Sequence, residues 1–377
     1  MGRQRSKAGG SRIVDVKVLA LASYPVEAAA TRYRLQQFVE PLAVRGIELT
    51  IKPFLDSDLF VRLYRDSSRV STAASLLWAT ARRLGMIVTL GNPDVILIQR
   101  EAMIIGPPVV EWWATWLLKQ PMVLDLDDAT YVPYTSPTYG GLTKALKFFR
   151  KTDQLIGWSR VVICGNQTIA DYVLSKGGRP EIIPTVVDTD KFKPGDTSTR
   201  SLPVVGWVGT HSTFPFLEAI LPALSAVAKR RPFKLKIVGS GRALVSVPGV
   251  EVENIEWNLD REIEDFQSLD IGLYPLSADN NWATGKSGFK AIQYMSVGVP
   301  YVATPIGAAA QIGAENVTHL FASTSAEWID KLAMLLDDDK KRHEMGRAGR
   351  RHAVECYHLD SQADKLAHIL REAAKRN

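Results

Sequence analysis

Hydrophobic and polar positions follow one another along the chain in two repeated series. Short apolar runs predict buried strands, and the amphipathic stretches between them have the spacing of helices. In the first series we expect strands at residues 16–22, 47–52, 95–98, 123–126, 161–164 and 182–183, and helical sequence at residues 28–45, 58–90 and 109–119. In the second we expect strands at residues 204–208, 235–238, 250–257, 271–274 and 301–303, and helices at residues 214–229, 260–268, 288–297 and beyond 325.

This order of elements predicts an α/β protein with two doubly wound, parallel-sheet (Rossmann-like) domains that face a central cleft. Ligands bind beyond the carboxyl ends of the strands in such domains, so the cleft is where we expect the site. A polar stretch with Lys, Pro and Gly separates the two series and predicts a linker. The expected divisions are a disordered basic tail (1–13), an N-terminal domain (14–187), the linker (188–201), a C-terminal domain (202–357), and a C-terminal helix (358–377) that could pack back on the N-terminal domain.

Composition narrows the classes of partner. The formal net charge is +6, which suits an anionic partner: nucleotide phosphate, acidic lipid headgroups or nucleic acid. Neither zinc-finger spacing nor a sheet motif with stacking aromatics is present, so we expect no nucleic acid. The two cysteines form no disulfide framework, and no apolar run reaches the roughly 18 residues that span a membrane. The basic first residues lack the apolar core of a secretory signal, and we expect a cytoplasmic protein.

The segment GKSGFKAIQYMSVGVPYVATPIG, from Gly285 to Gly307, has the most specific pattern. Helical spacing places Lys286, Lys290 and Gln293 on one face. Two lysines beside a helix N-terminus can neutralise a departing diphosphate where no metal does so. Ser287 and Gly288 lie at that N-terminus. The alternative is an ordinary solvated lysine face.

A second strand–turn–helix segment, PVVGWVGTHSTFPFLEAI, offers another anion site. Its strand ends at Gly209, and Thr210 and His211 follow in the turn. We expect Ser212 or Thr213 to cap the helix. His211 could donate to a phosphate or a sugar hydroxyl, or simply lie in a loop.

The segment VLDLDDATY places carboxylates at a strand end in the presumed cleft. Asp127 and Asp128 could bind sugar hydroxyls, act as a base, hold a divalent cation or cap the next turn. Arg100 follows the neighbouring strand. Arg32 and Arg34 open the first helical region and could meet an acidic acceptor, or only solvent.

Together these segments resemble the retaining family 4 glycosyltransferases of the GT-B fold. The match is to a bacterial branch whose donor motif reads Lys-x-x-x-Lys-x-x-(Glu/Gln)-Tyr-Met. It extends from about residue 16 to residue 370 and includes the pieces SRVVICGNQTIADYV, IIPTVVDTDKFKP, VGWVGTHST and DIGLYPL. The resemblance implies two Rossmann-like domains, of which the first takes the acceptor and the second the nucleotide sugar.

The resemblance also assigns roles to residues at the donor motif. Gln293 stands where a family glutamate binds the ribose, and Gly285 stands where a second glutamate contacts the donor sugar. Backbone amides at Ser287, Gly288 and Phe289 would take over contacts to sugar and phosphate.

At three further places the sequence departs from the family or only suggests a role. The family's diphosphate-binding Arg and Lys are replaced near Thr210, Ser212 and Thr213, so Lys286 and Lys290 would supply the charge. All histidines lie at or after His211, so the family's N-terminal histidine is absent, and Asp127 is our substitute. Trp257 would line the nucleobase pocket or belong to the core.

The resemblance thus implies a retaining glycosyltransferase that needs neither metal nor cofactor. It would move a hexose-type sugar from a UDP- or GDP-sugar to a glycan, lipid-linked or small-molecule acceptor, in the making of a bacterial surface glycan. The expected catalytic residues are Asp127, Lys286 and Lys290. The expected donor contacts are Gly209, Thr210, His211, Ser212, Thr213, Gly239, Trp257, Ser287, Gly288, Phe289 and Gln293. The expected acceptor-side residues are Arg32, Arg34, Arg100 and Asp128.

Other readings stay open at this point. The missing glutamate and histidine favour a non-catalytic binding subunit of a glycosylation complex, whereas the lysines and Gln293 argue against it. An epimerase would need an acidic and histidine set in the first domain, and a phosphorylase a cofactor lysine and a much longer chain; neither is found. Residues 58–90 and 142–151 combine Arg and Lys with Leu, Phe and Trp, which suits either the inner face of an anionic membrane or ordinary packing on the sheet.

Overall fold

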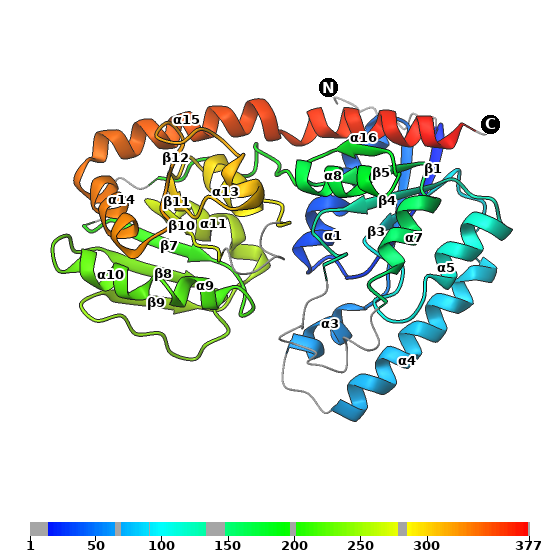
Figure 1. The fold of residues 1–377 in the computed structure, drawn as a ribbon, viewed down its shortest axis with the longest axis horizontal. Coiled ribbons are helices and arrows are strands. Elements are labelled where there is room, and N and C mark those ends of the chain that lie inside the picture. Colours follow the sequence, from blue (N-terminus) through cyan, green and yellow to red (C-terminus); the bar gives the residue numbers. More distant parts are fainter. Residues whose placement is uncertain are drawn as a thin grey trace, which may run out of the picture.

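The computed structural model describes residues 14–64, 69–89, 91–132, 148–196, 201–277 and 285–375. They form two α/β domains with the C-terminal helices running along one side of both (Figure 1). The predicted α/β class with two parallel sheets is confirmed. The tail 1–13 and part of the expected linker, residues 197–200, lie outside the described residues.

The N-terminal domain is built on a six-stranded parallel sheet in the order β2-β1-β3-β4-β5-β6. The central strands are nearly continuous apolar runs, because helices cover both faces of the sheet, whereas β2 alternates buried and exposed residues and β6 is only partly buried. The sheet reverses its direction of growth between β1 and β3, which leaves their carboxyl ends open to a ligand. The strands are β1 (Val16–Ala22), β2 (Ile47–Pro53), β3 (Val95–Gln99), β4 (Met122–Leu126), β5 (Val161–Cys164) and β6 (Pro180–Ile182).

The C-terminal domain holds a second six-stranded parallel sheet in the order β12-β11-β10-β7-β8-β9. Its reversal lies between β7 and β10, so its open strand ends belong to the loops after these two strands. The strands are β7 (Val204–Val208), β8 (Lys234–Val238), β9 (Glu251–Ile255), β10 (Ile271–Tyr274), β11 (Tyr301–Ala303) and β12 (His319–Phe321).

Helices and helical turns cover both sheets. In the N-terminal domain they are α1 (Ala29–Arg34), η1 (Gln36–Phe38), α2 (Val39–Val44), α3 (Ser57–Tyr64), α4 (Arg69–Gly85), η2 (Met86–Thr89), α5 (Val109–Trp112), the π-helical turn η3 (Trp113–Leu117), α7 (Lys151–Trp158) and α8 (Gln167–Ser175). In the C-terminal domain they are α9 (Phe214–Glu218), α10 (Leu221–Ala228), η4 (Leu259–Arg261), α11 (Glu262–Gln267), α13 (Phe289–Ser296), η5 (Gly307–Ala310), α14 (Ser325–Asp337) and α15 (Asp339–Tyr357), followed by α16 (Leu359–Ala374).

Two expected helices are interrupted. The prediction of one helix over residues 28–45 is wrong, because the chain forms α1, η1 and α2 instead. The helix expected over residues 214–229 is likewise divided into α9 and α10. Pro41 and Pro222 lack the N–H that a continuous helix would direct to the carbonyl four residues earlier, and their rings crowd that carbonyl.

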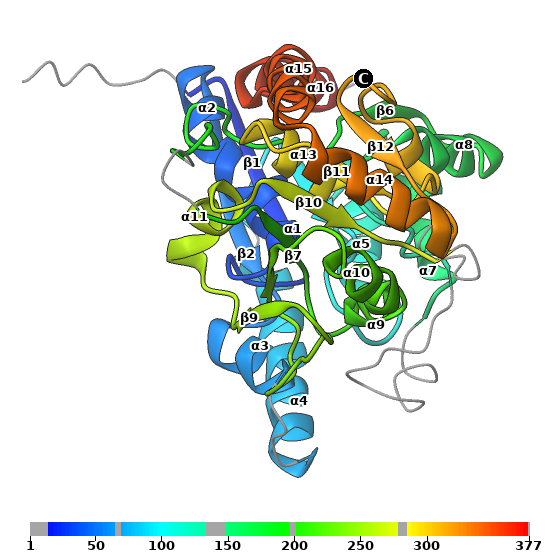
Figure 2. The same ribbon diagram turned by 90° about the vertical axis from the view of Figure 1, so that its left-hand side faces the viewer.

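The last helix returns to the first domain. α16 packs its apolar face on the N-terminal sheet, where Leu366 and Leu370 join the core formed by β1 and β3. Arg45 in the loop before β2 forms an ion pair with Asp364 of α16, with 2.6 Å between Nε and Oδ1. The two domains are therefore tied together by α15 and α16, which run across both (Figure 1), as well as by the chain that precedes β7. Figure 2 shows the same two helices from one end, at the top of the molecule.

The two regions that the sequence suggested for a membrane surface are only partly described. Residues 142–147 lie outside the described residues, and Lys151, at the end of that region, is buried in an ion pair with Glu101 at 2.6 Å. Arg83, within the other region, is 1% exposed and donates to the carbonyls of Ala22 and Lys52. Within the described residues every helix is too short or too polar to cross a bilayer.

Candidate functional site

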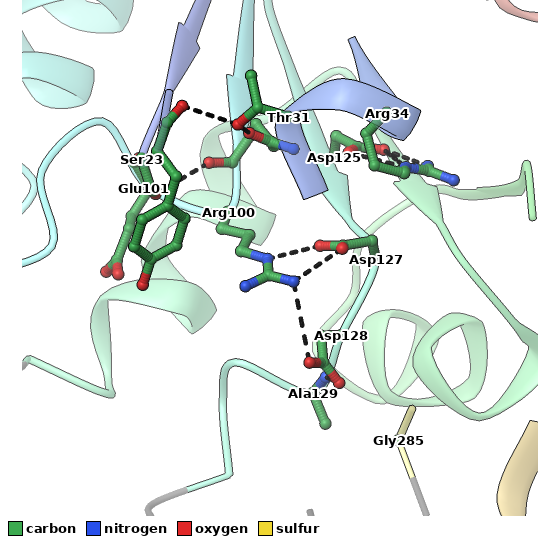
Figure 3. A network of polar contacts seen from close by, with 12 residues as sticks. Ser23, Thr31, Arg34, Arg100, Glu101, Asp125, Asp127, Asp128, Ala129 and Gly285 are labelled. Carbon is green, nitrogen blue, oxygen red and sulfur yellow. Dashed lines mark hydrogen bonds and ion pairs between the residues drawn. The ribbon is translucent and has the colours of Figure 1, made fainter. Parts of the chain in front are cut away.

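The carboxyl ends of β3 and β4 bring together one arginine and two aspartates. Arg100 donates from Nε to Asp127 Oδ1 over 2.6 Å and from Nη2 to Asp127 Oδ2 over 2.7 Å (Figure 3). The same guanidinium lies 3.8 Å from Asp128 Oδ2. Arg100 has a φ of 62°, a left-handed conformation that is uncommon for a residue other than glycine. This backbone turn aims the guanidinium at the two carboxylates.

The pKa values of the two aspartates are shifted in opposite directions. Burial disfavours the charged form of Asp127, but the Arg100 guanidinium outweighs it and holds the pKa of Asp127 below its usual value. Burial prevails at Asp128, whose pKa is raised despite Arg100 and Lys286 nearby. Because both oxygens of Asp127 are occupied by Arg100, it is poorly placed to hold a divalent cation or to take a proton. Asp128 is the more available of the two carboxyl groups.

A third aspartate of this strand end is structural. Asp125 forms a buried, bidentate pair with Arg34, whose Nε lies 3.1 Å from Asp125 Oδ2. Arg34 Nη1 also donates to the carbonyl of Ile183 over 2.7 Å. The expectation that Arg34 meets an acceptor or solvent is therefore wrong: its side chain is only 2% exposed and ties α1 to β4 and the chain after β6.

Replacing Asp125 by Ala should destabilise the N-terminal domain by about 3–5 kcal/mol, because it leaves the Arg34 guanidinium buried and unpaired. Urea denaturation followed by circular dichroism measures this free energy of unfolding. Asp364→Ala is the matched control, since it removes the partner of Arg45 at the surface and should cost less than about 1 kcal/mol. Equal losses in the two variants would contradict the structural role of Asp125.

The segment that begins at Gly285, in the C-terminal domain, rests directly on the N-terminal domain. Asn166 caps α8 by accepting from the N–H of Ile169 over 2.9 Å. Its Nδ2 also donates to the carbonyl of Lys286 over 3.2 Å. A Cβ on Gly285 would lie 2.2 Å from Cβ of Ala129, so only glycine fits there (Figure 3). A residue with a side chain at position 285 would therefore push this segment away from the N-terminal domain.

Lys286 points toward this junction and not into bulk solvent. It is half-buried, and its ammonium group interacts with Asp128 and Arg100 of the other domain. Burial and the repulsion from Arg100 lower the pKa of Lys286, while Asp128 opposes this shift. Because α13 begins only at Phe289, Lys286 lies in the loop before the helix, and the prediction that it shares a helix face with Lys290 and Gln293 is wrong.

The start of α13 supplies amide hydrogens beside Lys286. The first N–H groups of a helix have no intrahelical acceptor and favour an anion. Gly288 precedes the helix with a φ of 67°, and a Cβ there would lie 2.2 Å from Ile312 Cδ1. Glycine is therefore required for the turn that brings these amides to the junction.

The second lysine of the motif belongs to a buried chain of polar groups. Lys290 Nζ donates to Gln293 Oε1 over 2.8 Å, and Gln293 Nε2 lies 3.4 Å from Glu262 Oε1. The carboxylate of Glu262 accepts two hydrogen bonds from the N-terminal domain, one from Arg32 Nη2 over 3.1 Å and one from the hydroxyl of Tyr33 over 2.6 Å. This chain joins α13 and α11 to α1, so it links the two domains.

These contacts alter the expectations for two residues. Gln293 is fully buried, so its amide could reach a ribose only if the contacts to Lys290 and Glu262 were broken. Arg32 was expected on the acceptor side, but its guanidinium pairs with Glu262 and lies 4.9 Å from the ring of Tyr33 and 5.2 Å from the ring of Trp257. Trp257 is half-buried and packs against the core of the C-terminal domain, which agrees with its alternative role as a core residue, and its place in a nucleobase pocket stays a prediction.

The loops after β7 and β8 pack closely on each other. A Cβ on Gly239 would lie 2.4 Å from the carbonyl oxygen of Gly209, and Gly239 has a φ of 79°. A Cβ on Gly241 would lie 2.6 Å from Cβ of His211, which places His211 between the two loops. The glycines therefore allow the backbones of the two turns to approach each other closely.

The polar turn after β7 is held by its own side chains. Thr213 Oγ1 accepts from the N–H of Thr210 over 3.1 Å, and the hydroxyls of Thr210 and Ser212 lie 2.8 Å apart. The prediction that Ser212 or Thr213 caps the helix is wrong, because Thr213 at the N-cap position makes no side-chain bond to α9. The hydroxyl groups of this turn therefore stabilise the loop itself and do not cap the helix.

Comparison with known proteins agrees with this arrangement. Residues 203–338 match the family model described as glycosyl transferases group 1. A glycosyltransferase from Rickettsia africae superposes with a TM-score of 0.69 at 14% identity, over 96% of this chain and 99% of that one. The chain has the GT-B fold.

Two further GT-B neighbours have named ligands or activities. Anabaena HepE in complex with UDP and glucose gives a TM-score of 0.68 at 16% identity, over 95% of this chain and 100% of that one. Sucrose-phosphate synthase from Thermosynechococcus elongatus gives a TM-score of 0.68 at 13% identity, over 94% of this chain and 98% of that one. No curated protein sequence matches the chain significantly.

Sequence reasoning missed several residues of this GT-B cleft. Glu262 and Tyr33 were not singled out, although an acidic residue at a helix start after a strand was a usable signal for Glu262. Asn166 lay within a quoted segment, but only the fold shows that it reaches Lys286. Nothing in the local sequence indicates that Ala129 fills the space beside Gly285.

Proposed function

We propose that this chain is a nucleotide-sugar glycosyltransferase that retains the configuration of a hexose-type sugar and works without a metal ion or a cofactor. The observation that carries the proposal is the position of Lys286, at the start of α13 and within electrostatic range of Asp128 and Arg100 on the opposite domain. The match of residues 203–338 to group 1 glycosyl transferases supports it. So does the overall likeness to a structure bound to UDP and glucose.

In this proposal the diphosphate of the donor lies between Lys286 and the first-turn amides of α13. The bond between the sugar carbon and the diphosphate oxygen breaks, and the negative charge that develops on that oxygen is stabilised by the ammonium group and the amide dipoles. The acceptor hydroxyl attacks from the face that the nucleotide leaves and passes its proton to the departing diphosphate. The configuration of the sugar carbon is then unchanged.

The N-terminal domain would take the acceptor, which we propose to be a glycan or a lipid-linked sugar. Asp128 and Arg100 lie on that side of the cleft, and a carboxyl group beside a guanidinium can orient sugar hydroxyls. The ion pair with Arg100 keeps Asp127 charged, so Asp127 would act by fixing Arg100. Its direct contact with the sugar stays a prediction.

The deciding experiment incubates the protein with a panel of UDP-, GDP-, ADP- and TDP-sugars and measures released nucleoside diphosphate, with and without candidate acceptors. We expect release from one donor class and a product of retained configuration by NMR. An excess of EDTA should leave the rate unchanged. Tight binding of a nucleotide without any release, for every acceptor offered, would instead favour a non-catalytic binding subunit.

The affinity for UDP should depend on pH through Lys290. Burial lowers its pKa to about 8, with Arg32 and Lys286 contributing, although Glu262 opposes the shift. The cation is lost progressively as the pH rises through this value, so the dissociation constant of UDP should change little near pH 7, begin to rise as the pH approaches 8, and rise steeply above it. Isothermal titration between pH 7 and 9.5, where the terminal phosphate (pKa about 6) stays ionised, measures this.

Lys290→Arg supplies the control for that measurement. A guanidinium stays charged throughout this range, so the rise in the dissociation constant above pH 8 should be reduced in the variant. A wild-type affinity that is flat up to pH 9.5 would show that Lys290 does not contribute charge to the diphosphate site.

A further inference from the structure

One contact between the two domains joins oppositely charged groups next to the second lysine of the donor motif. Figure 1 shows α1 on the side of the N-terminal domain that faces α11 and α13. Glu262, the first residue of α11, is 5% exposed, and it accepts from Arg32 Nη2 over 3.1 Å and from the Tyr33 hydroxyl over 2.6 Å. A carboxylate of the C-terminal domain is therefore neutralised by a cation of the N-terminal domain.

The same carboxylate also faces Lys290 of its own domain. Gln293 lies between the two: its Oε1 accepts from Lys290 Nζ over 2.8 Å, and its Nε2 lies 3.4 Å from Glu262 Oε1. Gln293 is fully buried and Lys290 is half-buried. Charges act on each other more strongly where water is excluded, so Glu262 influences Lys290 across the short span of one amide group. Two cations, one from each domain, thus face one carboxylate.

The N-terminal domain fixes the position of its own cation. Arg32 Nη1 donates to the carbonyls of Val26 and Glu27 over 3.2 and 3.0 Å, in the loop after β1. The ring of the adjacent Tyr33 packs 4.5 Å from the ring of Phe289, the first residue of α13. A movement that separates the domains would therefore withdraw both hydrogen-bond donors from the carboxylate together.

We propose that Arg32 and Glu262 act as a charge switch that makes the affinity of the donor site depend on contact between the domains. With the domains in contact, Arg32 neutralises Glu262, and the ammonium group of Lys290 is available to the diphosphate. Without this contact, the unpaired carboxylate attracts Lys290 and repels the diphosphate. Glu262 is then a positioning residue that acts through Lys290. The inference rests on the proposed function, in which Lys290 contributes charge to the diphosphate site.

The charges around Lys290 agree with this arrangement. Burial lowers the pKa of Lys290, and the positive charges of Arg32 and Lys286 lower it further, whereas the negative charge of Glu262 raises it. Tyr33 stays neutral, because its burial raises the pKa of its hydroxyl well above the usual value. Removing the charge of Glu262 should therefore lower the pKa of Lys290, and removing the charge of Arg32 should raise it.

The pKa of Lys290 in the nucleotide-free protein tests the contact directly. NMR of the lysine ε-methylene groups across a pH titration measures it, and Lys290→Arg assigns the signal by removing it. We expect the pKa to fall in E262Q, which replaces the carboxylate by a neutral group of the same shape, and to rise in R32Q. A role of these residues in packing alone would not produce shifts of opposite sign.

The dissociation constant of UDP at pH 7 tests the effect on the donor site. R32Q should weaken binding about tenfold, because a buried carboxylate that has lost its partner then acts on the diphosphate. R32Q/E262Q removes both charges and should recover most of this loss. Arg32→Lys keeps the charge and should retain most of the wild-type affinity. Isothermal titration measures all four proteins.

Arg45→Gln is the matched control. The Arg45 side chain is 19% exposed, compared with 13% for Arg32, and it pairs with Asp364 in a different part of the N-terminal domain. This variant should change neither the affinity for UDP nor the pKa of Lys290, and thermal melts verify that every variant is folded.

Two results in protein that binds UDP would overturn the switch alone: equal affinities of R32Q and R32Q/E262Q, or a pKa of Lys290 that is unchanged in E262Q. The first would show that Arg32 contacts the diphosphate itself or only supports the fold. Wild-type protein that binds no nucleoside diphosphate would contradict the proposed function and, with it, the switch.

Discussion

Replacing Lys286 by Met should lower the rate of nucleoside diphosphate release by about 10²–10³-fold, the effect of removing one preorganised electrostatic contact from a transition state. Met keeps the length of the side chain and removes only the charge. The developing negative charge on the diphosphate would then meet the amides of α13 but no ammonium group. Asp128, which interacts with Lys286 in the structure, would also be left facing the leaving group.

Steady-state rates with the donor found in the nucleotide-sugar panel, together with the dissociation constant of UDP, measure the effect. Because the charge matters most in the transition state, we expect a larger loss in kcat than in the affinity for the donor. Lys286→Arg should keep part of the rate. Lys340→Met is the control, since its side chain is 85% exposed on α15 and distant from the junction. A K286M variant with wild-type kcat would remove the electrostatic basis of the proposed function.

The second large effect concerns the contact between Gly285 and Ala129. Gly285→Ala should lower kcat about tenfold or more, because the added Cβ would lie 2.2 Å from Cβ of Ala129 and force the donor motif away from the N-terminal domain. The φ angle of Gly285 is not in the left-handed region, so the effect of Gly285→Ala depends only on the space available for the added Cβ. The carbonyl of Lys286 would also move from Asn166, which now holds it at 3.2 Å.

A double-mutant cycle isolates this contact. Ala129→Gly removes the obstructing Cβ, so the pair A129G/G285A should recover most of the rate that G285A loses. Gly157→Ala is the control, because a Cβ at that position meets nothing within 4 Å. If Ala129→Gly gives no recovery, the closeness of the two domains at this point is not what Gly285 provides.

The links between the domains also bear on how the cleft operates. One link runs from Asn166 to Lys286 and a second from Arg32 and Tyr33 to Glu262. Both connect residues at or next to the proposed diphosphate site with the N-terminal domain. Under the proposed function, these contacts would hold the cationic groups of the site in place against the N-terminal domain.

Much of the architecture was predictable from the sequence. Strands buried on both faces tend to be nearly continuous apolar runs, and these runs located the strands of both sheets to within a few residues, except β12, which was not predicted. Their alternation with helical sequence predicted parallel pairing and two domains. The expected long helices over 28–45 and 214–229 were wrong, because the apolar period continues through Pro41 and Pro222 although the hydrogen bonds of a helix cannot.

The candidate site was also predictable only in part from the sequence. The sequence by itself determined the groups near the proposed diphosphate, since Lys286, Gly288 and the first turn of α13 follow one another along the chain and their proximity is local. Only the tertiary structure decided that Arg34 is buried, that Gln293 is enclosed by Lys290 and Glu262, and that Gly285 faces Ala129. The physical reason is distance along the chain: Arg32 and Glu262 are 230 residues apart, and only the packing of the two sheets brings such pairs together.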